Sequence, residues 1–60
     1  MKPGDLITQR STVHGVPGYY LILAYELDMI NMPCFIILIG DRTTVWTVDY
    51  TESYFRVVKT

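Results

Sequence analysis

The sequence predicts a small all-β domain, and three observations lead to this fold class. Three apolar blocks, at residues 19–25 (YYLILAY), 34–39 (CFIILI) and 43–48 (TTVWTV), fall within a chain of 60 residues. Each block is too short for a helix that buries one face, and each is rich in the β-branched and aromatic residues that strands favour. Glycine, proline, asparagine or aspartate bounds the blocks, as is typical of turns.

The first half of the chain predicts two strands separated by a long loop. A Pro3-Gly4-Asp5 turn precedes a short first strand at residues 6–9. Residues 10–18 (RSTVHGVPG) have the glycine, proline and hydroxyl content of an exposed loop. The second strand is predicted at residues 18–27, where both alternating sets of side chains are apolar. Such a strand must be covered on both faces, by a curled sheet or by another subunit.

The second half predicts a hairpin and a closing strand. Residues 28–33 (DMINMP) connect the second strand to a third at 34–39, and they are more apolar than an ordinary solvated loop. Gly40-Asp41 suits a tight turn into the fourth strand at 43–48, because such turns need positive φ angles. A single 3₁₀ turn is expected at 49–53, capped by Asp49 or Thr51, followed by a last strand at 54–59.

One shared apolar interior should hold one face of each strand. Side-chain parity within the runs selects the following core residues: Leu6, Leu21, Leu23, Ile37, Trp46, Phe55 and Val57.

The order of these elements predicts a five-stranded SH3-like barrel with a long first loop, formed by residues 1–60 as one domain. Closing so small a sheet hides the edges that would otherwise template aggregation. Closure also accounts for central strands that are apolar on both faces.

Several segments resemble very small SH3-like barrel proteins of tailed bacteriophages. Residues 1–7 (MKPGDLI) are similar to the family's Lys-Pro-Gly-Asp-Leu-Val opening, and residues 54–58 (YFRVV) to its Tyr-Leu-X-Val-Ile ending. The apolar strand at 20–23 and the strand of Trp46 extend the resemblance over most of the chain in outline. Residues 29–34 and the very apolar third strand depart from the family's more polar pattern. The resemblance implies a viral or phage-borne accessory protein in the host cytoplasm, and because members generally lack an assigned activity it implies no functional residues.

Charge and cysteine content restrict the partners and the compartment. Five Lys and Arg stand against six Asp and Glu, giving a net charge of −1, and they are scattered singly. Binding through phosphate neutralisation is therefore disfavoured. The lone Cys34 cannot form an internal disulfide, and its apolar neighbours predict a buried thiol in a reducing cytoplasm. The longest apolar run, residues 32–39, is well short of the ~20 residues of a membrane-spanning helix, and we expect a soluble protein that is not secreted.

The sequence offers no catalytic constellation, so we expect neither an enzyme nor a cofactor. The one histidine, His14, lies in the predicted first loop, where a solvated side chain is favoured over a general base. Asp41, Asp49 and Glu52 match no calcium-loop spacing and are better interpreted as a solvated charged face.

The aromatic residues are the best candidates for a binding surface. Tyrosine and tryptophan are favoured where a surface must be apolar and able to form hydrogen bonds together. Tyr50 and Tyr54, with a neighbour from the first loop, could form a shallow peptide groove, although that loop lacks the acids that accompany recognition of proline-rich ligands. The structural interpretation gives the same rings core and strand-pairing roles.

These observations lead to two functional hypotheses. The first is a non-enzymatic interaction module that forms a homo-oligomer, most simply a dimer, and docks on a protein partner. Its self-association surface would comprise the second and third strands and residues 29–32. The alternative is a small barrel that binds single-stranded nucleic acid through exposed aromatics, a mode that normally requires a basic groove. The predicted binding residues are Tyr19, Tyr20, Tyr50, Tyr54, Met29, Ile30 and Met32.

Overall fold

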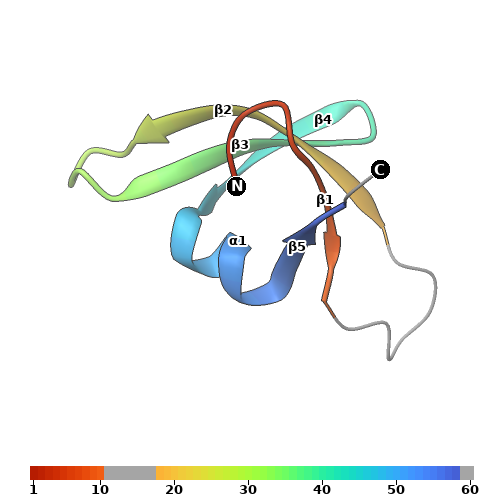
Figure 1. Cartoon of the computed structure of the whole chain (residues 1–60). Coiled ribbons are helices and arrows are strands. Elements are labelled where there is room, and N and C mark those ends of the chain that lie inside the picture. Colours follow the sequence, from red (N-terminus) through yellow and green to blue (C-terminus); the bar gives the residue numbers. More distant parts are fainter. Residues whose placement is uncertain (11–17, 59–60) are drawn as a thin grey trace.

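A computed structural model describes residues 1–10 and 18–58, which form one five-stranded antiparallel sheet and a short helix (Figure 1). The sheet order is β4-β3-β2-β1-β5. The predicted all-β class is confirmed, and the first four strands lie close to their predicted positions, whereas β5 is shorter. The elements are β1 (Leu6–Gln9), β2 (Tyr19–Leu27), β3 (Pro33–Ile39), β4 (Arg42–Thr47), α1 (Val48–Tyr54) and β5 (Phe55–Val57).

The sheet is curled, but hydrogen bonds between strands do not close it into a barrel. Among the described residues the strand pairings end at β4 and β5, the two edges of the sheet. Side chains nevertheless connect these edges, because the rings of Trp46 in β4 and Phe55 in β5 stack with their centroids 4.8 Å apart. Figure 1 shows α1 and β5 together on one side of the β2–β3–β4 meander. The curl therefore encloses an interior between the meander and the C-terminal elements.

The turn between β3 and β4 is the tight hairpin that the sequence predicts. The register pairs Ile39 with Arg42, so Gly40 and Asp41 are the two loop residues. Gly40 has a φ of +62°, whereas Asp41 is not among the described residues with positive φ. This pattern is that of a type II′ turn, in which glycine occupies the first central position.

The segment after β4 is an α-helix and not the predicted 3₁₀ turn. Its N-cap is Thr47, whose hydroxyl oxygen accepts a 3.1 Å hydrogen bond from the Tyr50 amide, so the predicted caps Asp49 and Thr51 were both wrong. Thr51 is instead buried, and its hydroxyl donates a 2.7 Å bond to the Thr47 carbonyl oxygen. Because Thr47 both ends β4 and caps α1, the strand ends one residue earlier than predicted. The helix extends one residue beyond the predicted turn at each end.

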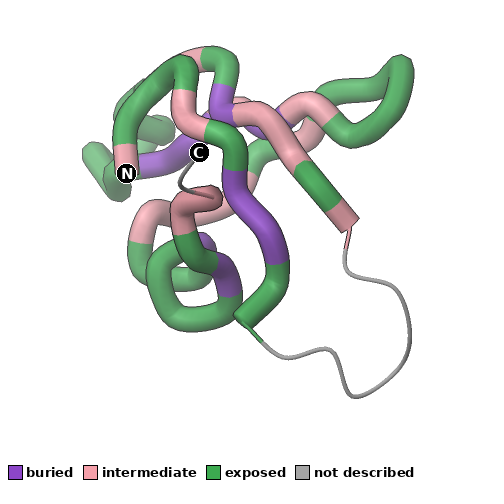
Figure 2. The backbone as a smooth tube through the Cα atoms, turned by 45° about the vertical axis from the view of Figure 1, so that its right-hand side comes forward, coloured by how far each residue is buried: buried purple, intermediate pink, exposed green. Residues whose placement is uncertain are grey.

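The core consists of five buried residues inside the curl, and half-buried side chains pack around it. Figure 2 shows where the buried, intermediate and exposed positions lie along the backbone. The buried residues are Ile7, Ile22, Phe35, Ile37 and Phe55, and the half-buried ones are Met1, Tyr20, Trp46, Val48 and Val57. The predictions for Ile37 and Phe55 are confirmed. Trp46 and Val57, also predicted as core residues, are only partly buried and pack against the edge of the core.

Three predicted core residues were wrong. Leu6 and Leu23 are 38% and 43% exposed, and Leu21 is only half-buried. The opposite face of each strand is turned inward, so Ile7 and Ile22 are fully buried in their place. Parity could not choose between two apolar faces, and the register shift between Ile22 and Ala24 further interrupts the alternation along β2.

Candidate interaction surfaces

Five aromatic rings form a continuous cluster from the core to the surface, at the junction of β4, α1 and β5. Trp46 contacts Tyr50 edge-on at 5.6 Å between ring centroids, and Tyr50 contacts Tyr54 at 5.0 Å. Tyr20 approaches Trp46 at 5.7 Å and Phe55 at 5.6 Å, also edge-on. Phe55 is buried, Trp46 and Tyr20 are half-buried, and Tyr50 and Tyr54 are exposed. This aromatic cluster is thus anchored at one end and accessible at the other.

The structure brings three of the four predicted tyrosines into this cluster. Tyr50 and Tyr54 lie one turn apart on α1, as neighbours in space. Tyr20 joins them through the Trp46 and Phe55 rings, and its position requires a glycine at 18, where a Cβ would lie 2.6 Å from the Tyr20 hydroxyl. Tyr19 is exposed and, because it directly precedes Tyr20 in β2, points to the opposite face. A contribution from the first loop concerns residues 11–17, which lie outside the described part of the chain.

Sequence reasoning placed Trp46 in the core and missed it as a site residue. Its ring is the link between buried Phe55 and exposed Tyr50. A signal was present: residues 46, 50 and 54 are aromatic at a spacing of four. Residues four apart are neighbours along a helix face, so recognising the helix would have joined Tyr50 and Tyr54. Trp46 precedes the helix in β4, and its contact with Tyr50 depends on how the chain turns from the strand into α1.

The connection between β2 and β3 is a turn organised by Asp28. One carboxylate oxygen, Oδ1, accepts hydrogen bonds from the amides of Ile30, at 2.9 Å, and of Met32, at 2.8 Å. The backbone of Asp28 adds two more, donating to the Met32 carbonyl and accepting from the Asn31 amide, each at 3.0 Å. Asn31 has a φ of +61°, in the left-handed region that asparagine tolerates better than most residues. The turn is therefore fixed by its own polar groups.

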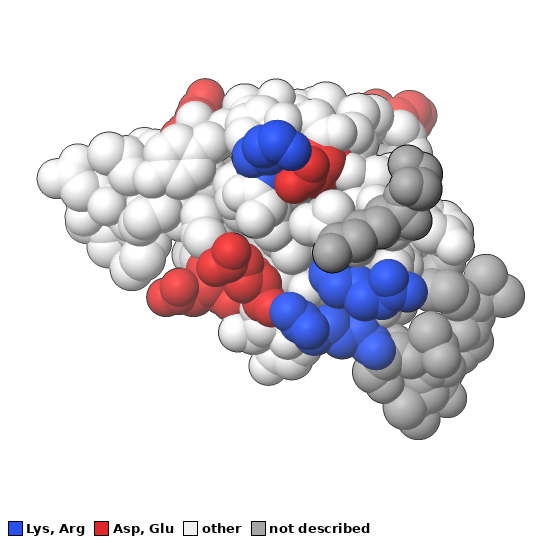
Figure 3. All heavy atoms as spheres, viewed as in Figure 1, with Lys and Arg blue, Asp and Glu red and all other residues white. Residues whose placement is uncertain are grey.

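This turn presents apolar side chains to solvent. Met29 is fully exposed at 101%, Ile30 is 77% exposed, and Met32 is exposed as well. Tyr25 and Leu27 at the end of β2 are also exposed, which extends the apolar surface along the hairpin. On the face shown in Figure 3, the projecting end of the β2–β3 hairpin carries no charged side chain. We refer to Met29, Ile30 and Met32 as the hairpin tip.

A second apolar surface covers the side of the sheet opposite the core. The strand register aligns Leu6, Leu21 and Leu38 in one row across the sheet. It aligns Ala24, Ile36 and Val45 in another row. Leu6 and Val45 are exposed, and the other four are half-buried. These six residues form the outer face, so the expectation that β2 and β3 are apolar on both sides is confirmed.

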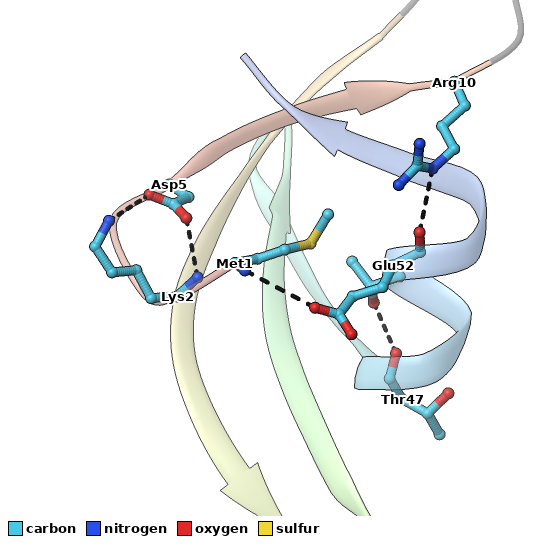
Figure 4. Close-up of polar contacts among 7 residues, drawn as sticks. Met1, Lys2, Asp5, Arg10, Thr47 and Glu52 are labelled. Carbon is cyan, nitrogen blue, oxygen red and sulfur yellow. Dashed lines mark hydrogen bonds and ion pairs between the residues drawn. The ribbon is translucent and has the colours of Figure 1, made fainter. Parts of the chain in front are cut away.

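The charged groups near the chain start and α1 are engaged in local contacts (Figure 4). The Arg10 guanidinium Nε donates a 3.1 Å hydrogen bond to the Glu52 carbonyl oxygen in the last turn of α1. The Glu52 carboxylate lies 3.9 Å from the terminal amine of Met1. Lys2 pairs with Asp5 at 2.8 Å, and its hydrogen bonds hold the pKa of the Asp5 carboxyl below its ordinary value. Arg10 therefore has a structural role at the helix end.

The thiol of Cys34 is buried, as predicted. Its Sγ atom lies 3.4 Å from the Met32 carbonyl oxygen, within hydrogen-bonding distance. Burial raises the pKa of this thiol, and the negative charges of Asp28 and Glu26 raise it further. Because the thiolate is the reactive form, Cys34 is suited to packing and not to nucleophilic chemistry.

Residues 1–10 and 18–58 contain no group of three or more His, Cys, Asp or Glu side chains placed to hold a metal ion. His14 lies outside these residues. In the same part of the chain, no helix has both the length and the apolar character needed to cross a membrane.

Comparisons with protein-family models, with curated proteins and with solved structures found no match. Function is therefore inferred from the surfaces themselves, and the resemblance to phage proteins stays a prediction.

Proposed function

We propose that the protein is a non-enzymatic interaction module, an accessory protein of a phage or prokaryote, that self-associates and docks on a protein partner. The hairpin tip carries this proposal. When exposed apolar side chains are gathered in one patch, the patch is commonly a binding surface for another molecule. Here they are gathered at the end of a projecting hairpin, on a turn that four hydrogen bonds hold in place.

A fixed turn favours binding because little freedom remains to be lost on association. Ordering a rotamer-rich side chain at an interface costs about 0.5–1.5 kcal/mol, and ordering a flexible loop adds to the free-energy cost of binding. A turn whose backbone is already held in place avoids the cost of ordering the loop. Methionine also suits such a surface, since its unbranched, polarizable side chain adapts to the shape of a partner. We propose the two methionines and Ile30 as contact residues, with the exposed tyrosines of the aromatic cluster and Tyr19 as further binding residues.

An SH3-like arrangement of the fold is part of the same proposal. The order of strands along the chain, the single helix between β4 and β5, and the stacking of Trp46 on Phe55 between the two edges all support it. The sheet topology also supports it, because β1 to β4 form a meander and the last strand, β5, returns to pair with the first strand, β1.

Self-association is supported by the outer face together with the hairpin tip. Burying apolar surface yields about 25 cal/mol per Å², so a second copy that covers these residues gains stability. A two-fold contact is self-complementary, and one substitution then alters both sides of the interface. The simplest assembly is a homodimer.

The test is the mass of the native protein by light scattering over a range of concentrations. We expect a dimeric mass for the wild type, and for Ile30→Glu a shift to monomer or to aggregate because a charge enters the apolar contact. Ser53→Glu, at an exposed position of α1, is the matched control and should keep the wild-type mass. A monomeric wild type at high concentration would contradict self-association.

The alternative function, binding of single-stranded nucleic acid, draws support from the exposed rings of Tyr50 and Tyr54. Stacking of bases on such rings normally accompanies a basic groove. Here the Lys2 ammonium pairs with Asp5, and the five Lys and Arg of the chain are outnumbered by six Asp and Glu, which counts against binding of phosphates. Submicromolar, salt-sensitive binding of a single-stranded oligonucleotide would favour this alternative over docking on a protein.

A further inference from the structure

We propose that β4 is the strand through which two copies of this chain pair, edge to edge and antiparallel, about a two-fold axis at Thr44. This inference rests on the proposed self-association but assigns its contact to the β4 edge in place of the hairpin tip and the outer face. Under edge pairing, Ile30→Glu would keep the dimeric mass. It starts from β4 being an edge of the sheet, with β3 on one side only.

The register identifies which backbone groups of β4 face away from β3. A two-residue hairpin is closed by a hydrogen-bonded pair, here Ile39 and Arg42, and in an antiparallel ladder such pairs alternate with non-bonded ones. The residues of β4 bonded to β3 are then 42, 44 and 46. The amides and carbonyls of Thr43 and Val45 point outward. The same alternation holds across the sheet, because Ile22, opposite Ile37 in a non-bonded pair, bonds on its other side to Gly4 and Asp5.

These outward groups are accessible. Thr43 and Val45 are both exposed, and no hydrogen bond from another described residue reaches their outward backbone groups. Edge strands are commonly protected by proline, lysine, a bulge or a short length. β4 has six residues, none of them proline or lysine, and its one charge, Arg42, lies at its start beside the hairpin turn. The register shift of the sheet falls in β2. The opposite edge, β5, has only three residues, with Arg56 at its centre.

A second copy of the same strand fits this edge in one register. Pairing about Thr44 sets Thr43 of each copy opposite Val45 of the other, which forms four backbone hydrogen bonds from the outward groups alone. Moving the axis to Val45 would require Thr47, whose carbonyl oxygen already accepts from Thr51 at the start of α1. Moving it to Thr43 would require Asp41 in the hairpin turn. The chosen register therefore uses every outward group of the strand and no other element.

Side chains in this register are compatible. Threonine faces threonine at the axis, and β-branched Val45 and Thr43 are neighbours on the outer face, where such cross-strand pairs are favourable. Arg42 of each copy lies opposite Trp46 of the other, which places a cation beside an indole ring and keeps the two arginines apart. Parallel pairing in register would instead set the two arginines side by side. Across the axis, the row that ends in Val45 meets Thr43 of the second copy, which lies beside Leu38 and Leu21 in the other row. The apolar outer faces of both copies therefore become continuous.

The substitution Val45→Pro tests the backbone pairing directly. Its ring removes an amide that faces away from β3, so the internal ladder keeps its hydrogen bonds, as is usual for proline on edge strands. Val45→Thr is the matched control, because it keeps the amide and the β-branched shape. We expect Val45→Pro to halve the mass measured by light scattering, with an unchanged circular dichroism spectrum, and Val45→Thr to retain the dimeric mass.

Hydrogen exchange of the wild type supplies an answer that does not depend on how the proline variant folds. Where ~99% of chains are dimeric, the amides of Thr43 and Val45 should exchange about 100-fold more slowly than in the monomer, because exchange then occurs only in the dissociated chain. Dilution should remove this protection. A dimeric wild type with both amides unprotected, or a folded Val45→Pro that stays dimeric, would overturn edge pairing and leave self-association through another surface. A monomeric wild type would overturn both proposals.

Discussion

Trp46 and Phe55 stack with an interplanar angle of 24°, although they belong to the two strands that end the sheet on either side. Between these edge strands the sheet contains three others. The contact shows that side-chain packing, and not a ladder of hydrogen bonds, holds the two ends of the curled sheet together. Phe55 is the buried partner and also lies against Tyr20 and Tyr50.

Phe55→Ala should therefore strongly destabilise the fold. Truncating a buried phenylalanine to alanine costs about 3–5 kcal/mol, which is much of the stability of a small domain. The measurement is the free energy of unfolding in urea, followed by circular dichroism. Tyr54→Ala, at the exposed neighbouring position, is the control and should cost far less. An unchanged unfolding midpoint for Phe55→Ala would show that the ring does not hold the core.

Asp28→Ala should loosen the hairpin tip without unfolding the sheet. The substitution removes the carboxylate oxygen that accepts from the amides of Ile30 and Met32. Hydrogen bonds to charged groups contribute about 1.5–3 kcal/mol, less at an exposed turn, so exchange of these two amides should accelerate by about tenfold. Amide exchange measured by NMR checks this. Glu26→Ala provides an acidic control on β2, and equal exchange rates in both variants would show that the carboxylate does not organise the turn.

Lys2→Ala should raise the pKa of Asp5. The ammonium of Lys2 hydrogen-bonds the carboxylate and is the largest cause of the lowered pKa, with the Lys2 amide as a further donor. A pKa lowered by folding stabilises the native state above the ordinary value of 3.8, and this contribution is lost as the pH falls through the folded pKa. NMR titration of the Asp5 carboxyl carbon measures the shift, with Lys2→Arg as the charge-conserving control. A titration identical in wild type and Lys2→Ala would assign the lowered pKa to other groups.

Cys34 should resist alkylation until the chain unfolds. Its side chain is buried and its pKa is raised, so both access and thiolate content are low in the native state. Iodoacetamide at neutral pH should modify the native protein slowly and the urea-unfolded protein rapidly, as followed by mass spectrometry. Fast stoichiometric modification under native conditions would place the thiol at the surface.

The strand positions could be predicted from the sequence because turn residues separate short apolar runs. The Pro3-Gly4-Asp5 and Gly40-Asp41 turns fix where β1 begins and where β3 meets β4. The inward face of β2 could not be predicted, because both alternating sets of its side chains, Tyr20 with Ile22 and Leu21 with Leu23, are hydrophobic enough to enter a core. Only the curl of the sheet, which a residue pattern does not specify, decides between them. The helix was missed for a different reason: the residue that caps it, Thr47, also fits a strand.

The candidate surfaces were predicted to a similar extent. Exposure of Met29, Ile30 and Met32 followed from an apolar connection between two strands, since turn residues have little core to enter. The role of Asp28 could not be inferred, because its bonds to the backbone depend on the conformation of the turn. Tyr19 and Tyr20 are adjacent in sequence, yet strand geometry sends them to opposite sides, where only Tyr20 meets the aromatic cluster.

The place of Trp46 has a practical consequence, since it is the one tryptophan of the chain. Its indole lies where β4, α1 and β5 converge, within 6 Å centroid to centroid of Tyr20, Tyr50 and Phe55. Its emission will therefore respond to separation of the two sheet edges, and energy transfer from nearby tyrosines to the indole will report the same event. Intrinsic fluorescence can therefore be used to follow separation of the two sheet edges in the unlabelled protein.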